Sequence, residues 1–476
     1  MTLISIFLEC FVLGMVAFTL PCIFPLAPLT ISYFTQQSER EASVLPRALA
    51  YAASIVVIYV GLGLLVTLLF GAGALNELAS DGFFNVFLFA VLLLFGAVLL
   101  GAFELNLPSR WVNGIAAKSE LKGGLGIFFM AATLAVVSFS CIGPLIGTIL
   151  VTVGVQGAHS YLAPSVGMLG FSLALAGIFF GFALFPKALQ RLPKSGNWLN
   201  SIKVSLGILE IGLAFKFLST ADLAYHWNVL SRELFILIWI GLSLLLCFNL
   251  LGKIRFPHDG VVARIGLVRG LFAASSFAFA LYLGSGFFGD SLQVLSGFLP
   301  PRVETISKLN TAPKKYSDFL HMPHQIDGFF DYEEALTYAK KVHKPLLLDF
   351  TGHGCVNCRK MEAEVWSVPA VLALLKEKYV VVSLYTDDKT ALPLEEQFDS
   401  AILKTRVTTV GKKFKHLQAT RFASISQPYY VLQNGAAKLL VTPPIGVELD
   451  AQKYQNYLER GLREFISISN ENLLSN

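Results

Sequence analysis

The stretch KPLLLDFTGHGCVNCRKMEAEVW, residues 344–366, decides the fold of the C-terminal part of this chain. Residues 345–350 form a short apolar run after a proline, which predicts a buried strand. Gly352 and Gly354 then favour a tight turn. A helix is expected to begin near Cys355, so the stretch reads as strand, turn, helix.

Two cysteines at the start of this helix predict redox chemistry. A helix N-terminus stabilises negative charge, so the Cys355 thiol loses its proton more easily there and becomes a better nucleophile. We expect Cys355 to attack a disulfide and Cys358, one turn later, to resolve the mixed disulfide. Met361 and Val365 are expected on the same side of the helix as Cys358.

A structural zinc site and a pair of idle thiols are the alternatives for this motif. Zinc in a structural site needs four ligands. The sequence of this domain offers no second CxxC and no matching histidine pair. His353 lies beside the motif, but one histidine and two cysteines do not complete a site. The pattern therefore favours redox chemistry.

The arrangement resembles the thioredoxin-like proteins. Asp349 stands six residues before the first cysteine, as does the buried acid of those proteins, and such an acid can accept a proton from the resolving thiol. Glu362, four residues after Cys358, either assists or is a solvated helix residue. Residues 379–388 are expected to form the next central strand. In SQPYYVLQNGAAKLL, residues 426–440, Pro428 matches the cis-proline that precedes a strand, and Asn434-Gly435 predicts a hairpin turn.

One position departs from the thioredoxin-like pattern. Many of these proteins have tryptophan just before the first cysteine, whereas this chain has Gly354 after His353. The difference bears on the acidity of the CxxC motif and on the choice of partner.

The chain as a whole is too apolar for a soluble protein: of 476 residues, 54% are hydrophobic and 14% charged. A transmembrane helix needs about 20 apolar residues. The N-terminus lacks the marks of a cleaved signal peptide, so we expect it to be a retained first span. From about residue 302 charged residues become frequent, which predicts a membrane domain over 1–290, a linker over 291–325 and a soluble domain over 326–476. Eight spans are predicted, at about 3–34, 48–72, 83–104, 124–152, 161–186, 204–219, 234–251 and 265–289.

Basic residues between the spans predict the topology. With the N-terminus outside, the four inner loops carry twelve Lys and Arg residues and the three outer loops carry only Arg232. This asymmetry fits the positive-inside rule and places the soluble domain outside. The net charge of +5 is therefore a membrane signal and does not indicate nucleic-acid binding.

Two membrane cysteines each precede a proline by three residues: Cys22 with Pro25, and Cys141 with Pro144. Proline removes a helix hydrogen bond, and broken helices are tolerated where the backbone faces protein or a water-filled cavity. The first and fourth spans run in opposite directions, which suggests inverted three-helix repeats. One cysteine from each repeat would then meet as a dithiol. Cys10 and Cys247 lack such prolines and are expected to be small core residues.

The whole chain resembles the DsbD family of transmembrane thiol:disulfide interchange proteins. TLPCIFPLAPLT, FSCIGPLIGT and the span layout resemble its CcdA-type membrane domain, and LLLDFTGHGCVNCRKME and SQPYYV resemble its exported thioredoxin-like domain. The resemblance implies that cytoplasmic thioredoxin reduces a membrane pair, Cys22 and Cys141. That pair reduces the exported pair, Cys355 and Cys358, which in turn reduces periplasmic thiol-disulfide proteins. It also implies a bacterial inner-membrane location.

The expected absence of one module follows from the same comparison. Family members with three modules carry an immunoglobulin-like thiol domain before the first span, whereas residue 1 here is almost in the membrane. We expect that module to be absent or supplied by another chain. No phosphate loop or GxGxxG follows a strand, so no cofactor is expected.

Three alternative functions remain open at this point. An oxidase would pass electrons inward to a quinone. A soft-metal or solute transporter with an attached redox domain would use Cys22 and Cys141 as ligands. A reductase specialised for cytochrome c maturation would share the chemistry and differ in its client. Glu210, an acid inside a predicted span, either hydrates a cavity or hydrogen-bonds within the bundle.

Overall fold

The computed structural model describes most of the chain. It separates into two compact units, Met1–Phe217 with Trp239–Leu281, and Leu218–Ile238 with Tyr282–Asn476. The described residues are 3–18, 44–70, 81–102, 127–128, 131–132, 135, 162–184, 197–257, 265–288, 292–301 and 314–474.

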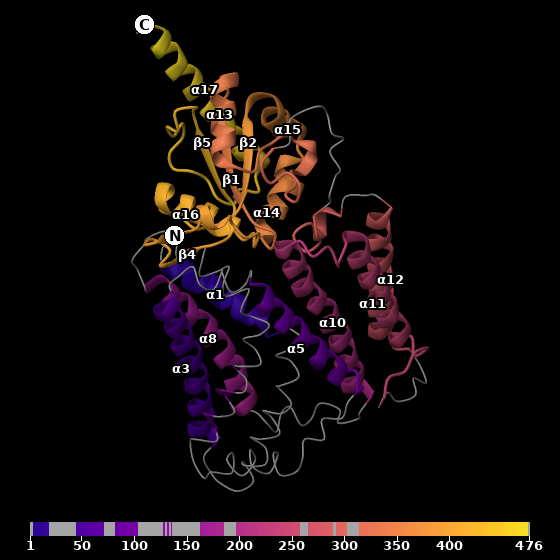
Figure 1. The fold of residues 1–476 in the computed structure, drawn as a ribbon. Coiled ribbons are helices and arrows are strands. Elements are labelled where there is room, and N and C mark those ends of the chain that lie inside the picture. The colour runs from indigo at the N-terminus through magenta and orange to yellow at the C-terminus, as the bar shows by residue number, and fades with distance from the viewer. Residues whose placement is uncertain are drawn as a thin grey trace. The chain divides into compact units, whose positions relative to one another are not determined.

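The first unit is helical (Figure 1). Its helices are strongly apolar. Five of the described helices have stretches long and apolar enough to cross a membrane, and two shorter apolar helices accompany them. The predicted helical membrane domain is thus confirmed, but the count of eight spans is not, because most of residues 124–152 lie outside the described part. The helices are α1 (Leu3–Ala17), α3 (Val44–Phe70), α5 (Gly82–Leu99), α8 (Leu162–Leu184), α10 (Asn197–Tyr225), α11 (Arg232–Leu250) and α12 (Leu267–Phe287).

Small residues allow close packing of α1 against α8. A Cβ atom added at Gly14 would lie 2.6 Å from the Phe171 carbonyl oxygen, and one at Gly170 would lie 2.6 Å from that of Phe7. Such close approach of backbones is how helices associate where lipid removes the hydrophobic driving force. Cys10 is buried in the same contact and Cys247 is buried on α11, both as free thiols. Their predicted place in the core is confirmed.

The second unit contains an α/β domain (Figure 1). Its main sheet has the order β2-β1-β5, with β1 parallel to β2 and antiparallel to β5, and a small sheet pairs β3 with β4. The predicted strands at 345–350 and 379–388 are confirmed as β1 and β2. The elements are α13 (Tyr332–Val342), β1 (Leu346–Thr351), α14 (Val356–Lys360), a π-helical turn (Met361–Trp366), α15 (Pro369–Ala373), a second π-helical turn (Leu374–Lys378), β2 (Val380–Tyr385), β3 (Phe398–Ser400), β4 (Thr405–Val407), α16 (Val410–Phe422), β5 (Tyr429–Gln433) and α17 (Ala451–Leu474).

The two faces of the sheet carry separate cores because successive strand residues point to opposite faces. Leu346, Leu348 and Phe350 of β1 pack with residues of α13 and α16. Leu347 packs with residues of the π-helical turn and α17. The alternation puts Asp349 and Thr351 on the face of Leu347, beneath the helix that carries the CxxC motif. The period of the strand therefore positions an acid under the redox site.

Candidate redox site

The CxxC motif lies at the C-terminal end of β1, where α14 begins. Cys355 and Cys358 are joined as a disulfide, with Cα atoms 5.3 Å apart. Cys355 is partly exposed, whereas only 1% of Cys358 is accessible. The Cys358 backbone N–H donates to the Cys355 sulfur over 3.1 Å, an interaction that would stabilise a thiolate at Cys355. The exposed sulfur fits the attacking role and the buried one the resolving role.

Asp349 is a buried acid on the same sheet face. It is 2% exposed, and one of its oxygens accepts a hydrogen bond of 2.7 Å from the Ser383 hydroxyl. Ser383 is its register partner on β2. Burial raises the pKa of Asp349 to about 6, although the Ser383 hydrogen bond and the Arg359 charge oppose the shift. The group can therefore exchange a proton near neutral pH.

Glu362 follows in the π-helical turn and is buried, so the solvated alternative is wrong for it. Its carboxylate pairs with Arg359 at 2.8 Å. Burial raises the pKa of Glu362 to about 7 because the effect exceeds the opposing charge of Arg359, and Asp349 adds to it. Two buried acids thus titrate near neutrality, and both are influenced by the charge of Arg359, the residue after Cys358.

Arg359 is a site residue that the sequence reasoning missed. Its guanidinium donates to the Thr351 hydroxyl at 3.2 Å and lies over the Tyr385 ring, in addition to the pair with Glu362. The signal was present: a basic residue directly after the second cysteine, three positions before a glutamate, predicts a pair on one helix face. Without that charge the two acids would be buried with no cation.

Pro428 precedes β5 and its peptide bond with Gln427 is cis, as expected. The Gln427 side chain donates to the Thr386 hydroxyl, and its oxygen lies 2.6 Å from a Cβ built at Gly352. This segment therefore lies beside the turn that carries the CxxC motif. The predicted hairpin is wider than two residues: the Asn434 N–H donates to the Lys438 carbonyl, and Ala437 takes a left-handed backbone conformation with φ 60°.

Gly354 is explained by a neighbour from α10. A Cβ at Gly354 would lie 3.0 Å from the Thr220 methyl carbon, which belongs to the same compact unit. Gly354 does not have a positive φ, so the backbone conformation does not require glycine here. The nearby Thr220 side chain limits the size of the residue at this position. Any side chain in place of Gly354 would therefore be in tight contact with Thr220.

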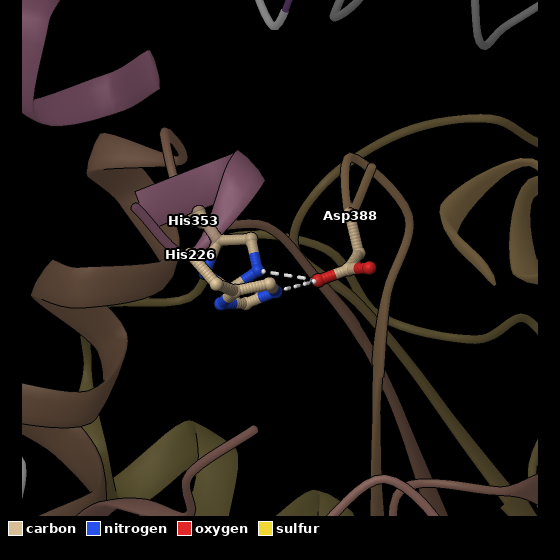
Figure 2. Close-up of side chains that lie close together, drawn as sticks. All are labelled: His226, His353 and Asp388. Carbon is tan, nitrogen blue, oxygen red and sulfur yellow. Dashed lines mark hydrogen bonds and ion pairs between the residues drawn. The ribbon is translucent and has the colours of Figure 1, made fainter. Parts of the chain in front are cut away.

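His353, the residue before Gly354, points at the carboxylate of Asp388. Figure 2 shows the His353 and His226 rings converging on Asp388. The Asp388 Oδ2 atom lies 3.1 Å from His353 Nε2 and 2.7 Å from His226 Nε2. Burial favours the neutral acid, but hydrogen bonds from both histidines outweigh it and hold the pKa of Asp388 well below its usual value. His226 comes from the turn between α10 and α11, 127 positions before His353 in the sequence, so the sequence alone could not pair them.

The other predicted site residues, Cys22, Pro25, Cys141 and Pro144, lie outside the described residues. Glu210 is described: it is 2% exposed on α10, and its Oε2 atom has no hydrogen-bond partner among the described residues. The structure thus brings together the site residues of the C-terminal domain, and the membrane pair stays a prediction.

Comparison with known proteins finds the same resemblance. The sequence model of a family described as "Cytochrome C biogenesis protein transmembrane domain" matches residues 3–221, and a thioredoxin-like family matches residues 326–402. Curated relatives named "Thiol:disulfide interchange protein DsbD" match across most of the chain. The chain is thus similar to DsbD-family proteins over most of its length. The predicted resemblance is therefore confirmed.

Three DsbD-family relatives show the extent of the similarity. The protein of Pseudoalteromonas atlantica is 26% identical over 86% of this chain and 65% of its own length. The protein of Ralstonia nicotianae is 24% identical over 79% of this chain and 59% of its own length. "Thiol:disulfide interchange protein DsbD 2" of Pseudomonas aeruginosa is 29% identical over 77% and 59%. The chain thus spans less than two thirds of the length of these relatives.

Proposed function

We propose that this protein is a transmembrane protein-disulfide reductase of the bacterial inner membrane. Electrons pass from cytoplasmic thioredoxin to the Cys22/Cys141 pair, then to the Cys355/Cys358 pair, and finally to exported thiol-disulfide proteins. The observation that carries the proposal is the Cys355–Cys358 disulfide at the start of α14, with a buried acid on the strand before it, Asp349, and another on the turn after it, Glu362. The names of the relatives support the same chemistry.

The geometry explains how the exported pair would work. Once reduced, the accessible Cys355 thiolate attacks a disulfide of the client, forming a mixed disulfide and releasing one client thiolate. Cys358 then attacks the Cys355 sulfur, which re-forms the disulfide and releases the second client thiol. Asp349 and Glu362, with pKa values of about 6 and about 7, accept the proton that Cys358 must lose. The client disulfide thus gains the two electrons that the Cys355/Cys358 dithiol loses.

For the membrane part we propose the eight-span layout over 1–290 with inverted three-helix repeats, then a linker over 291–325 and the thioredoxin-like domain over 326–476. Cys22 and Cys141 form the membrane dithiol, exposed to a cavity by the helix breaks at Pro25 and Pro144. The match of residues 3–221 to the family's transmembrane domain supports this assignment, because it includes both cysteines.

The proposed orientation places the C-terminal domain in the periplasm. The turn between α10 and α11 belongs to the same compact unit as the thioredoxin-like domain. The Lys389 N–H also donates to the Ala224 carbonyl at 3.0 Å. The positive-inside rule puts this turn outside, since its only basic residue is Arg232. A domain that packs on the turn shares its side of the membrane.

Redox potentials support outward electron flow. Thioredoxin has a potential of about −270 mV and a strong periplasmic oxidant one of about −120 mV. For two electrons this difference of roughly 150 mV corresponds to about 7 kcal/mol. The relay therefore needs no nucleotide or further cofactor.

The reduction of proteins in cytochrome c maturation is a second candidate role, favoured by the name of the matching membrane family. This role uses the same residues and differs only in the exported protein that receives the electrons.

Trapping tests the proposed delivery step. In Cys358→Ser, a client disulfide attacked by Cys355 cannot be resolved, so mixed disulfides with exported proteins should accumulate in intact cells. The matched control Cys355→Ser keeps the buried thiol and should trap few or none. Equal trapping by the two variants, or trapping only in Cys355→Ser, would reject the assigned roles.

A further inference from the structure

His226, His353 and Asp388 present one donor atom each to a common point. Among the residues that the structure describes, they are the one set of three His, Cys, Asp or Glu side chains whose ligand atoms gather in this way, all within 4.8 Å of one another. The imidazole Nε2 atoms lie 2.7 Å (His226) and 3.1 Å (His353) from Asp388 Oδ2. Figure 2 marks both interactions with dashed lines. Their convergence on one oxygen is the observation that needs an explanation.

The cluster has the charge and burial of a cation site. The Asp388 side chain is fully buried, and those of His353 and His226 are 7% and 22% exposed. A buried carboxylate needs a positive partner or strong donors. Neutral imidazoles provide donors but no charge, whereas a cation between the three groups would neutralise the carboxylate.

The three ligand atoms determine which metal ion fits the site. Two imidazole nitrogens and one carboxylate oxygen suit a borderline divalent cation, and zinc takes such ligands at about 2.0–2.2 Å in a tetrahedron. Neighbouring ligand atoms of that tetrahedron are roughly 3.4 Å apart by these bond lengths. The two N···O separations of 2.7 and 3.1 Å are shorter by less than 1 Å, so a small outward shift of the rings makes room.

We propose that His226, His353 and Asp388 form a binding site for a divalent metal ion, with Zn²⁺ as the best-fitting ion. Each histidine would bind through Nε2 and carry its remaining proton on Nδ1. Three protein ligands leave the fourth tetrahedral position to water. The Cys355–Cys358 disulfide supplies no thiolate to this site.

The surroundings hold the three ligands in place, as the outer shell of a metal site does. The other Asp388 oxygen accepts the Thr390 N–H at 2.9 Å, which leaves Oδ2 to face the histidines. The His353 ring packs on Tyr385 with centroids 4.5 Å apart, and the His226 ring packs on Phe319 at 4.8 Å. The ligands are therefore oriented without the ion.

The site would connect three segments of one unit. His226 lies in the turn between α10 and α11, His353 in the loop two residues before Cys355, and Asp388 in the loop after β2. A bound ion would fix the CxxC loop to that turn. The metal site itself does not depend on the proposed electron route.

Zinc titration of the full chain in detergent tests the proposal. The background is Cys22→Ser/Cys141→Ser with the Cys355–Cys358 disulfide kept oxidised, so that no dithiol competes for the metal. After chelator treatment, competition with a chromogenic zinc indicator should show one tight site per chain. His226→Ala and Asp388→Asn should each weaken it at least tenfold. His416→Ala, which alters a histidine on α16 that bonds to Ser400, should bind as the parent does.

Two further readouts separate metal binding from a structural role. Co²⁺ should give the visible spectrum of a tetrahedral nitrogen–oxygen site without thiolate charge-transfer bands, and Zn²⁺ should raise the Tm of the parent but not of His226→Gln. If the parent takes up no zinc, or if His226→Ala binds it equally well, the cluster is only a hydrogen-bonded contact and the proposal is wrong.

Discussion

Asp349 on β1 and Ser383 on β2 are register partners in the parallel pair, and the Ser383 hydroxyl donates to the Asp349 carboxylate at 2.7 Å. Successive strand residues point to opposite faces of the sheet, so Leu346, Leu348 and Phe350 lie in the core on one face. Asp349 and Ser383 lie on the opposite face, on the side of the CxxC helix. A proton-exchanging acid is therefore part of the strand that builds the fold.

The buried acids predict a pH-dependent stability. The folded state binds their protons more tightly than the unfolded state, in which the pKa values are near the ordinary 3.8 for Asp349 and 4.5 for Glu362. Stability is greatest below these values and is lost as the pH rises through about 6 and about 7. The contribution of Asp349 to the free energy of unfolding amounts to roughly 2–3 kcal/mol, since one pKa unit corresponds to about 1.4 kcal/mol.

Hydrogen exchange measures this effect. With intrinsic rates divided out, amides of β1 and β2 in the full chain should lose protection between pH 4 and pH 7, and Asp349→Asn should lose less. A protection that rises with pH over this window would contradict the raised pKa values.

Arg359 should be coupled energetically to Glu362. Arg359→Met leaves buried carboxylates without their cation, and breaking a buried pair from one side typically costs about 3–5 kcal/mol. Glu362→Gln in the same chain removes the charge left behind and should restore much of the stability. The measurement is a double-mutant cycle on Tm of the full chain; additive losses would mean that the pair is not coupled.

Gly354 and Thr220 should form a second energetically coupled pair, because little space separates them. Gly354→Ala puts a methyl group 3.0 Å from the Thr220 methyl carbon, a tight contact whose cost we expect to be about 1 kcal/mol. Thr220→Ser removes that carbon and should be nearly neutral alone. Combined with Gly354→Ala it should recover the loss in Tm. A full loss in the double variant would show that Thr220 does not restrict this position.

The two free thiols should be dispensable for electron transfer. Cys10 and Cys247 are buried core residues, so Cys10→Ala and Cys247→Ala should leave the rate of Cys355–Cys358 reduction within about twofold of the parent. The rate is followed by alkylation of the two cysteines after acid quenching. A large loss in either variant with unchanged Tm would mean that the relay uses different thiols from those proposed.

The features that short stretches of sequence determine could be predicted from the sequence. The strand before the CxxC motif, the helix after it, the cis-proline position and the helical membrane domain each follow from short-range periodicity or motif spacing. Cys358, Met361 and Val365 are all buried.

Contacts between distant segments could not be predicted in this way. Nothing local links His226 to Asp388, or Thr220 to Gly354, because each pair is joined only by the packing of the turn between α10 and α11 within the same unit. The widening of the helix at Met361–Trp366 into a π-helical turn also has no signature in its residues. The packing of the turn between α10 and α11 also places the His226 ring beside His353, with ring centroids 5.3 Å apart.

The most direct test of the relay uses membrane vesicles supplied with reduced thioredoxin on the cytoplasmic side. The redox state of Cys355 and Cys358 is followed by thiol trapping in the parent chain and in Cys22→Ser. The account predicts that the pair becomes reduced in the parent and stays oxidised in Cys22→Ser. Reduction in both would show that electrons bypass the membrane cysteine, and oxidation in both would show that thioredoxin is not the donor.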